Sequence, residues 1–183
     1  MLKALFLLFS MQLTNIDNAL ASKNLAQNTD SIQKDFAYKI CNYHEFTFVI
    51  LKIYDAYLCT NNGEYLKPGK IYETDFSLIL RYNMNFDKEE LAKSSIEEIN
   101  RYYQVTKKDQ QLYHKKLMSI FPDVKKGGEI EARYSKNGFV ELFYNKKLTG
   151  KITDSKFSRI FLDIWLHKDN KYQKMIKELF KNE

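Results

Sequence analysis

The chain of 183 residues has the length of one ordinary domain. Hydrophobic residues make up 44% of it and aromatic residues 15%, which is enough for a packed core and excludes a chain that is disordered throughout. Two cysteines are too few for a small fold held together by several disulfides, or for a zinc site built from cysteines. No apolar run reaches the roughly 20 residues that a membrane-spanning helix needs, so we expect no transmembrane segment.

The net charge is +6, and a basic protein can have nucleic acid or an acidic surface as its partner. Here the lysines occur in separate pairs with acidic residues between them, and there is no run of five or more. This spacing is typical of a solvated lysine-rich surface, so we expect no nucleic-acid partner. The pairs are Lys107-Lys108, Lys115-Lys116, Lys125-Lys126 and Lys146-Lys147.

Residues 1–21 have the pattern of a secretory signal peptide. Lys3 precedes a short apolar stretch, and Ala19-Leu20-Ala21 provides the small residues of a cleavage site before Ser22. Cleavage there would make the protein periplasmic or secreted; a buried first helix is the alternative. Residues 22–31 are polar and aperiodic, which predicts a flexible lead-in to a single domain over 32–183.

The first half of that domain has the residue types of strands, which we expect at 35–43, 46–59 and 72–82. The segment 46–59 is the most apolar. Its β-branched and aromatic residues occupy both odd- and even-numbered positions, and so both faces of a strand. This indicates one central strand that is covered on both faces.

Helical periodicity begins after Asn85, a candidate cap, and predicts helices from there and over 108–121. A hairpin follows over 129–145. A third helix follows a cap at Thr153 or Asp154, and a last helix lies near the C-terminus. The order β-β-β-α-α-β-β-α-α, with short turns between strands, indicates an α+β fold in which a large antiparallel sheet packs against helices.

The third predicted helix carries an apolar stripe, which we expect to lie buried against the sheet. Its members are Phe157, Ile160, Phe161, Ile164 and Trp165.

The sequence contains none of the common nucleophile, phosphate-binding, dinucleotide-binding or zinc-protease motifs. His44, His114 and His167 are scattered, with no metal-ligand spacing between them. We therefore predict no catalytic residue, no metal and no cofactor.

Lys52 and Asp55 are unusual because they interrupt the most apolar segment. In a continuous strand Lys52 shares a face with Phe48 and Tyr54. One interpretation is structural, with Lys52 at a sheet edge or paired to an acid on a neighbouring strand. The other makes Lys52 a cation at the bottom of an apolar pocket that binds an anionic ligand. Arg81 would be a second cation there, and Tyr54 a hydrogen-bond donor.

Export favours a disulfide between Cys41 and Cys59, but a long central strand argues against it. If the chain turns at 42–45, the two cysteines lie roughly 40 Å apart, whereas a disulfide needs Cα atoms within about 7 Å. We therefore expect two free thiols. The alternative is that 46–59 folds back as two strands and brings the cysteines together.

Several segments taken together resemble the bacterial exported branch of the chalcone isomerase-like family, over roughly residues 35–180. The resemblance implies a large antiparallel sheet curved against a layer of helices, with a ligand cleft between them. The segments are Lys52-Ile53-Tyr54-Asp55-Ala56-Tyr57-Leu58, Leu78-Ile79-Leu80-Arg81-Tyr82, Gly138-Phe139, Phe143-Tyr144-Asn145-Lys146, Phe157, Phe161 and Ile164-Trp165-Leu166.

Plant enzymes of this family cyclise chalcones, whereas other members bind fatty acids and catalyse nothing. The catalytic threonine of the enzymes falls on Lys52, their tyrosine falls near Phe86 and Asp87, and their asparagine near Ser94. Their catalytic arginine has no counterpart.

The resemblance therefore implies an exported, non-catalytic binding protein for a small apolar anion such as a fatty acid, with Lys52, Tyr54 and Arg81 at the ligand. The alternatives are an isomerase or lyase acting on a phenolic enone, and an interaction protein without a small ligand.

Overall fold

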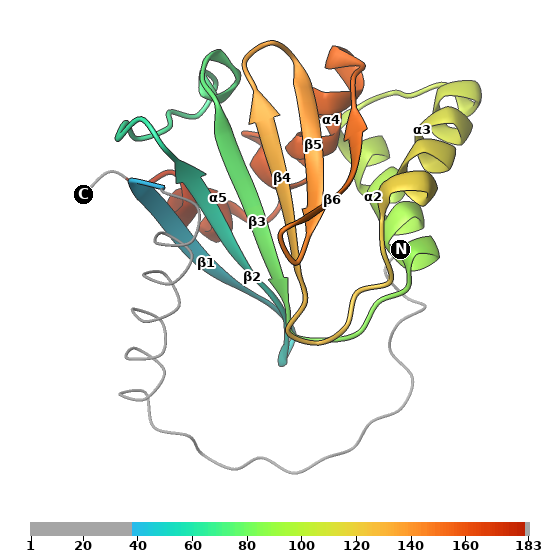
Figure 1. Ribbon diagram of the computed structural model, residues 1–183, viewed down its shortest axis with the longest axis horizontal. Coiled ribbons are helices and arrows are strands. Elements are labelled where there is room, and N and C mark those ends of the chain that lie inside the picture. The colour runs from blue at the N-terminus through green and yellow to red at the C-terminus, as the bar shows by residue number, and fades with distance from the viewer. Residues whose placement is uncertain (1–37, 182–183) are drawn as a thin grey trace.

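The computed structural model describes residues 38–181, in which six antiparallel strands form one sheet in chain order. The helices of these residues all lie on one side of the sheet (Figure 1). This confirms the predicted α+β class and its large antiparallel sheet; the predicted signal peptide and lead-in lie outside the described residues. The strands are β1 (Ile40–Phe48), β2 (Leu51–Thr60), β3 (Phe76–Tyr82), β4 (Glu129–Ser135), β5 (Phe139–Tyr144) and β6 (Lys147–Ile152).

Helix α5 packs on β1 and β2, α4 on β5 and β6, and α3 on β6, while α2 packs against α3 and α4. Aspartates fix two of the helix starts. Asp87, two residues beyond the predicted cap Asn85, caps α2 in a capping box with Glu90, and the predicted cap Asp154 is confirmed for α4. The helices are α2 (Lys88–Tyr102), α3 (Lys107–Ile120), α4 (Ser155–Leu166) and α5 (Gln173–Leu179), and a 3-10 turn covers Ile71–Glu73.

The segment 46–59 is two strands, not one. β1 continues to Phe48, the chain turns at Val49 and Ile50, and β2 begins at Leu51. The turn contains no Gly, Pro, Asn or Asp, and Val49 adopts a φ of 59° that β-branched residues rarely accept. Sequence patterns do not reveal a turn made of apolar residues. This explains why the two strands were predicted as one.

This hairpin brings Cys41 directly opposite Cys59, with their Cα atoms 4.1 Å apart and their sulfurs bonded. The prediction of two free thiols is therefore wrong. It depended on a turn at 42–45, and these residues lie inside β1.

Strand β6 was not predicted, because it is short, polar and interrupted by Gly150. The turn before it is formed by Asn145 and Lys146, both at positive φ, as in a two-residue hairpin turn. Gly150 allows α3 to approach the sheet closely, since a Cβ there would clash with the side chain of Ile120.

The main core lies between the sheet and the helices and contains Ala56, Leu58, Leu78 and Leu80 of the central strands. On the opposite face a smaller cluster surrounds Tyr57, Cys59 and Ile79. The helices therefore pack on the inward face of the sheet. A ligand site between the sheet and the helices would lie on that face.

Candidate functional site

A cavity of about 400 Å³ lies between the inward face of β1–β3 and the helices α2, α4 and α5. This volume is within the range of small-molecule sites. Most of its walls are apolar or aromatic. The apolar lining residues are Phe46, Phe48, Leu51, Ile53, Met84, Phe86, Leu91, Phe121, Ile164 and Met175.

A β-bulge decides which residues of β2 face this cavity. Phe46 pairs with Tyr54, whereas the next residue of β1, Thr47, pairs with Lys52, so Ile53 is an extra residue in β2. Tyr54, Ile53 and Leu51 consequently line the cavity, and Lys52 does not. The expectation that Lys52 and Tyr54 share a face is wrong, because it assumed an unbroken alternation along the strand.

Lys52 instead binds two carboxylates. Its Nζ lies 2.8 Å from Glu45 and 3.0 Å from Asp55, and Asp55 also accepts a hydrogen bond of 2.7 Å from the Tyr43 hydroxyl. Burial lowers the pKa of Lys52, but its hydrogen bonds to Glu45 and Asp55 outweigh burial and raise the pKa above its ordinary value. This arrangement matches the structural interpretation, in which Lys52 pairs with an acid on a neighbouring strand.

Arg81 is likewise held in an ion pair. Its guanidinium lies 3.1 Å from Glu129 of β4 and 5.8 Å from the centre of the Tyr57 ring. Tyr57 belongs to the cluster on the face away from the helices. Of the three residues predicted at the ligand, the structure therefore brings only Tyr54 to the cavity.

Tyr54 is the polar centre of the apolar wall. Its ring stacks on Phe46 at 4.8 Å and meets Tyr82 edge-on at 5.9 Å. Burial raises the pKa of Tyr54 well above its ordinary value; the neighbouring Tyr82 raises it further, while a hydrogen bond with Trp165 lowers it. Because an indole N–H is only a donor, Tyr54 accepts that bond and keeps its own proton for another acceptor.

Trp165 has a different place from the one predicted. The first part of the α4 stripe is buried in the core, with Phe157 and Phe161 2% and 1% exposed. Ile164 and Trp165, one turn further on, are half-buried and line the cavity. Trp165 meets Phe161 edge-on at 5.6 Å, so the stripe passes from core to cavity wall along the helix.

Helix α2 forms the polar side of the cavity. Its residues there are three carboxylates, two serines and one cation: Glu90, Glu97, Glu98, Ser94, Ser95 and Lys93. The sequence patterns did not identify these residues as part of a site, because they have the spacing of a solvated helix face.

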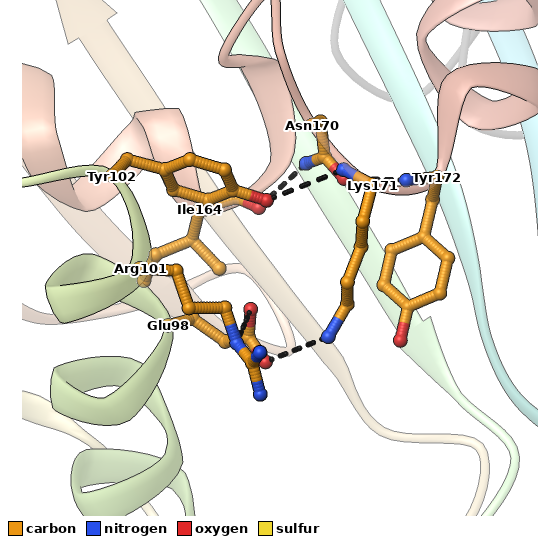
Figure 2. A network of polar contacts seen from close by, with 7 residues as sticks. All are labelled: Glu98, Arg101, Tyr102, Ile164, Asn170, Lys171 and Tyr172. Carbon is orange, nitrogen blue, oxygen red and sulfur yellow. Dashed lines mark hydrogen bonds and ion pairs between the residues drawn. The ribbon is translucent and has the colours of Figure 1, made fainter. Parts of the chain in front are cut away.

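Glu98 connects α2 to the loop between α4 and α5 (Figure 2). It accepts from Arg101 at 2.9 Å and from Lys171 at 3.3 Å. In the same loop the buried Asn170 donates to the carbonyl of Ile164 and accepts from the backbone N–H of Tyr172, both at 2.9 Å. The network fixes the loop, and with it the positions of two cavity residues, Ile164 and Tyr172.

Between residues 38 and 181 no group of three or more His, Cys, Asp or Glu side chains could hold a metal ion. No helix in that part of the chain is long and apolar enough to cross a membrane.

The model of the chalcone isomerase-like family matches residues 47–180. The match covers most of the chain, so this protein belongs to the chalcone isomerase-like family.

Among solved structures, the fold is similar to the crystal structure of a fatty-acid binding protein from Arabidopsis thaliana. The TM-score is 0.57 at 9% identity, and the alignment covers 76% of this chain and 84% of that chain. At this identity the similarity concerns the fold. No curated protein sequence matches the chain.

Proposed function

We propose that this protein binds a small apolar ligand of the fatty-acid type and does not transform it. The observation that carries the proposal is the cavity of about 400 Å³, whose mostly apolar walls include the half-buried Tyr54. The similarity of the fold to a fatty-acid binding protein supports it.

In this proposal the chain of the ligand packs among Phe46, Phe86 and Ile164, and its carboxyl oxygen accepts a hydrogen bond from the Tyr54 hydroxyl. The raised pKa of Tyr54 keeps the phenol neutral and therefore a donor. Lys93, the cation among the lining residues, lies on the α2 side, where a carboxylate can meet it near water. Lys52 and Arg81 keep their structural ion pairs.

The alternative of an isomerase acting on a phenolic enone is less well supported. Such a reaction needs a cation or a strong donor beside the developing enolate, and a placed acid or base. Phe86, near which the enzymes carry their tyrosine, lines the cavity without a phenol. Lys52 and Arg81 are both engaged by carboxylates outside it.

We also propose that the protein is exported and belongs to the bacterial exported branch of the family. Two independent features support this. The disulfide between Cys41 and Cys59 is of the kind that persists in oxidising compartments. The pattern of Lys3, a short apolar stretch and Ala19-Leu20-Ala21 is that of a cleavable signal.

Native mass spectrometry of the purified mature protein tests the binding proposal. We expect an added mass of one lipid-like molecule that is lost on delipidation and restored by a long-chain fatty acid. Tyr54→Phe should weaken that binding about five- to tenfold, the worth of one hydrogen bond. Tyr113→Phe is the matched control, because Tyr113 is a buried tyrosine that packs on Phe157 outside the cavity. An empty protein that takes up no fatty acid would leave an interaction protein as the remaining interpretation.

A further inference from the structure

The β1–β2 hairpin ends in an exposed apolar tip. Val49 and Ile50 are 78% and 82% exposed, although turns of this kind usually carry Asn, Asp or Gly. Val49 also accepts a φ of 59°, which is strained for a β-branched residue. Two exposed apolar side chains at a strained turn do not stabilise the hairpin. Their presence there therefore needs another explanation.

The tip is continuous with the ligand cavity. The residues on either side of it, Phe48 and Leu51, both line the cavity, and so does Met84 in the loop after β3. The backbone of that loop is joined to β2 by a hydrogen bond of 2.8 Å from Asn83 to the carbonyl of Ile53. An apolar surface therefore runs from the exposed tip into the cavity.

The same end of the sheet carries exposed lysines. In the antiparallel order, the β1–β2 turn, the loop before β4 and the β5–β6 turn all lie at one end (Figure 1). Two of the four lysine pairs of the sequence, Lys125-Lys126 and Lys146-Lys147, lie in or next to these connections and are exposed. Of the carboxylates nearby, Glu129 is paired with Arg81, and Asp123 accepts a hydrogen bond from the backbone N–H of Lys88.

We propose that this end of the molecule docks on a lipid bilayer with anionic headgroups, with Val49 and Ile50 inserted among the lipids. An exposed apolar tip flanked by lysines has the two components that peripheral membrane binding requires. Docking would place the cavity beside the bilayer, so that an apolar ligand passes between them without crossing water. This second statement rests on the proposed binding function.

Co-sedimentation of the full protein with vesicles tests the docking. Vesicles of phosphatidylcholine containing phosphatidylglycerol should bind the protein, pure phosphatidylcholine should bind it much less, and salt should weaken the binding. Ile50→Ser should lower the partition coefficient about tenfold, because the side chain no longer leaves water for lipid. Val49→Asn should lower it too, and it preserves the turn because Asn tolerates positive φ.

Leu112→Ser is the matched control, since Leu112 is 61% exposed on α3, away from the tip. It should bind vesicles like the wild type. The proposal would be overturned if the wild type did not bind anionic vesicles. It would also be overturned if the tip variants bound the vesicles as well as Leu112→Ser does. A fluorescent fatty acid added without vesicles separates the two ideas. Tip variants that still bind it but lose the vesicles support docking, whereas a wild type that does not bind it contradicts the binding function and leaves the docking result intact.

Discussion

Cys41 and Cys59 face each other across the first hairpin and are joined by a disulfide. The bond crosses the two strands near the ends that lie away from the apolar turn. It closes a loop that contains the strained Val49 and the bulge at Ile53. The covalent link therefore stabilises the hairpin that forms one wall of the cavity.

The disulfide should contribute about 3 kcal/mol to the free energy of unfolding, given its sequence separation of 18 residues. Cys41→Ser with Cys59→Ser should lower the denaturant midpoint by a corresponding amount. Wild type measured with a thiol reductant should match the double variant. Titration of the denatured, unreduced protein should find no thiols; two thiols per chain would mean that the hairpin is not linked.

Trp165→Ala should cost about 2 kcal/mol, less than a fully buried tryptophan, because Trp165 already borders a cavity. Phe161→Ala provides the comparison. Phe161 is 1% exposed one turn earlier on the same helix, and its loss should cost about 3–5 kcal/mol. Equal losses in denaturant unfolding would show that Trp165 belongs to the core.

Lys52→Met should leave the affinity for a fatty acid unchanged, because Lys52 lies outside the cavity. It should lower the stability by about 1 kcal/mol, since the buried Asp55 loses one of its partners while keeping Tyr43. Lys168→Met, at an exposed pair with Asp169, should change neither quantity. If Lys52→Met lost ligand affinity and Lys168→Met did not, Lys52 would belong to the ligand site.

The protein should lose stability as the pH rises above about 10. Burial is the first cause of the raised pKa of several tyrosines, including Tyr54 and Tyr82, and it raises that of Tyr57 to about 12. Tyrosines of the unfolded chain ionise near 10, so above that pH the folded state holds more protons and the free energy of unfolding falls. Tyrosinate absorbance should therefore appear partly together with the loss of circular dichroism. Full ionisation of all tyrosines near pH 10 in a folded protein would contradict the burial.

The fold class could be predicted because periodicity separates strands from helices in most of the chain. The Asp154 cap and the apolar stripe of α4, with Phe157, Ile160 and Phe161 buried, follow from side-chain chemistry alone. Strand β6 could not be predicted, because an edge strand with Gly150 buries too little apolar surface to show a pattern.

The site was harder to predict. One unrecognised turn accounts for most of the wrong predictions. The apolar turn at Val49-Ile50 carries none of the residues that mark turns, so two strands read as one. The wrong prediction of two free cysteines followed from that reading. The bulge at Ile53 then reversed the face of Lys52 relative to Tyr54. Bulges and strained turns are set by tertiary packing, and alternation along a single strand cannot reveal them.

Fluorescence of Trp165 offers the most direct test of the binding function. Trp165 is the only tryptophan in the sequence and lines the cavity, so its emission reports on that site alone. Titration of the delipidated protein with a long-chain fatty acid should change the emission in a saturable way, with one ligand per chain. Tyr54→Phe should shift the curve to higher concentration, and Tyr113→Phe should leave it in place. An emission that stays constant throughout the titration would contradict a ligand in the cavity.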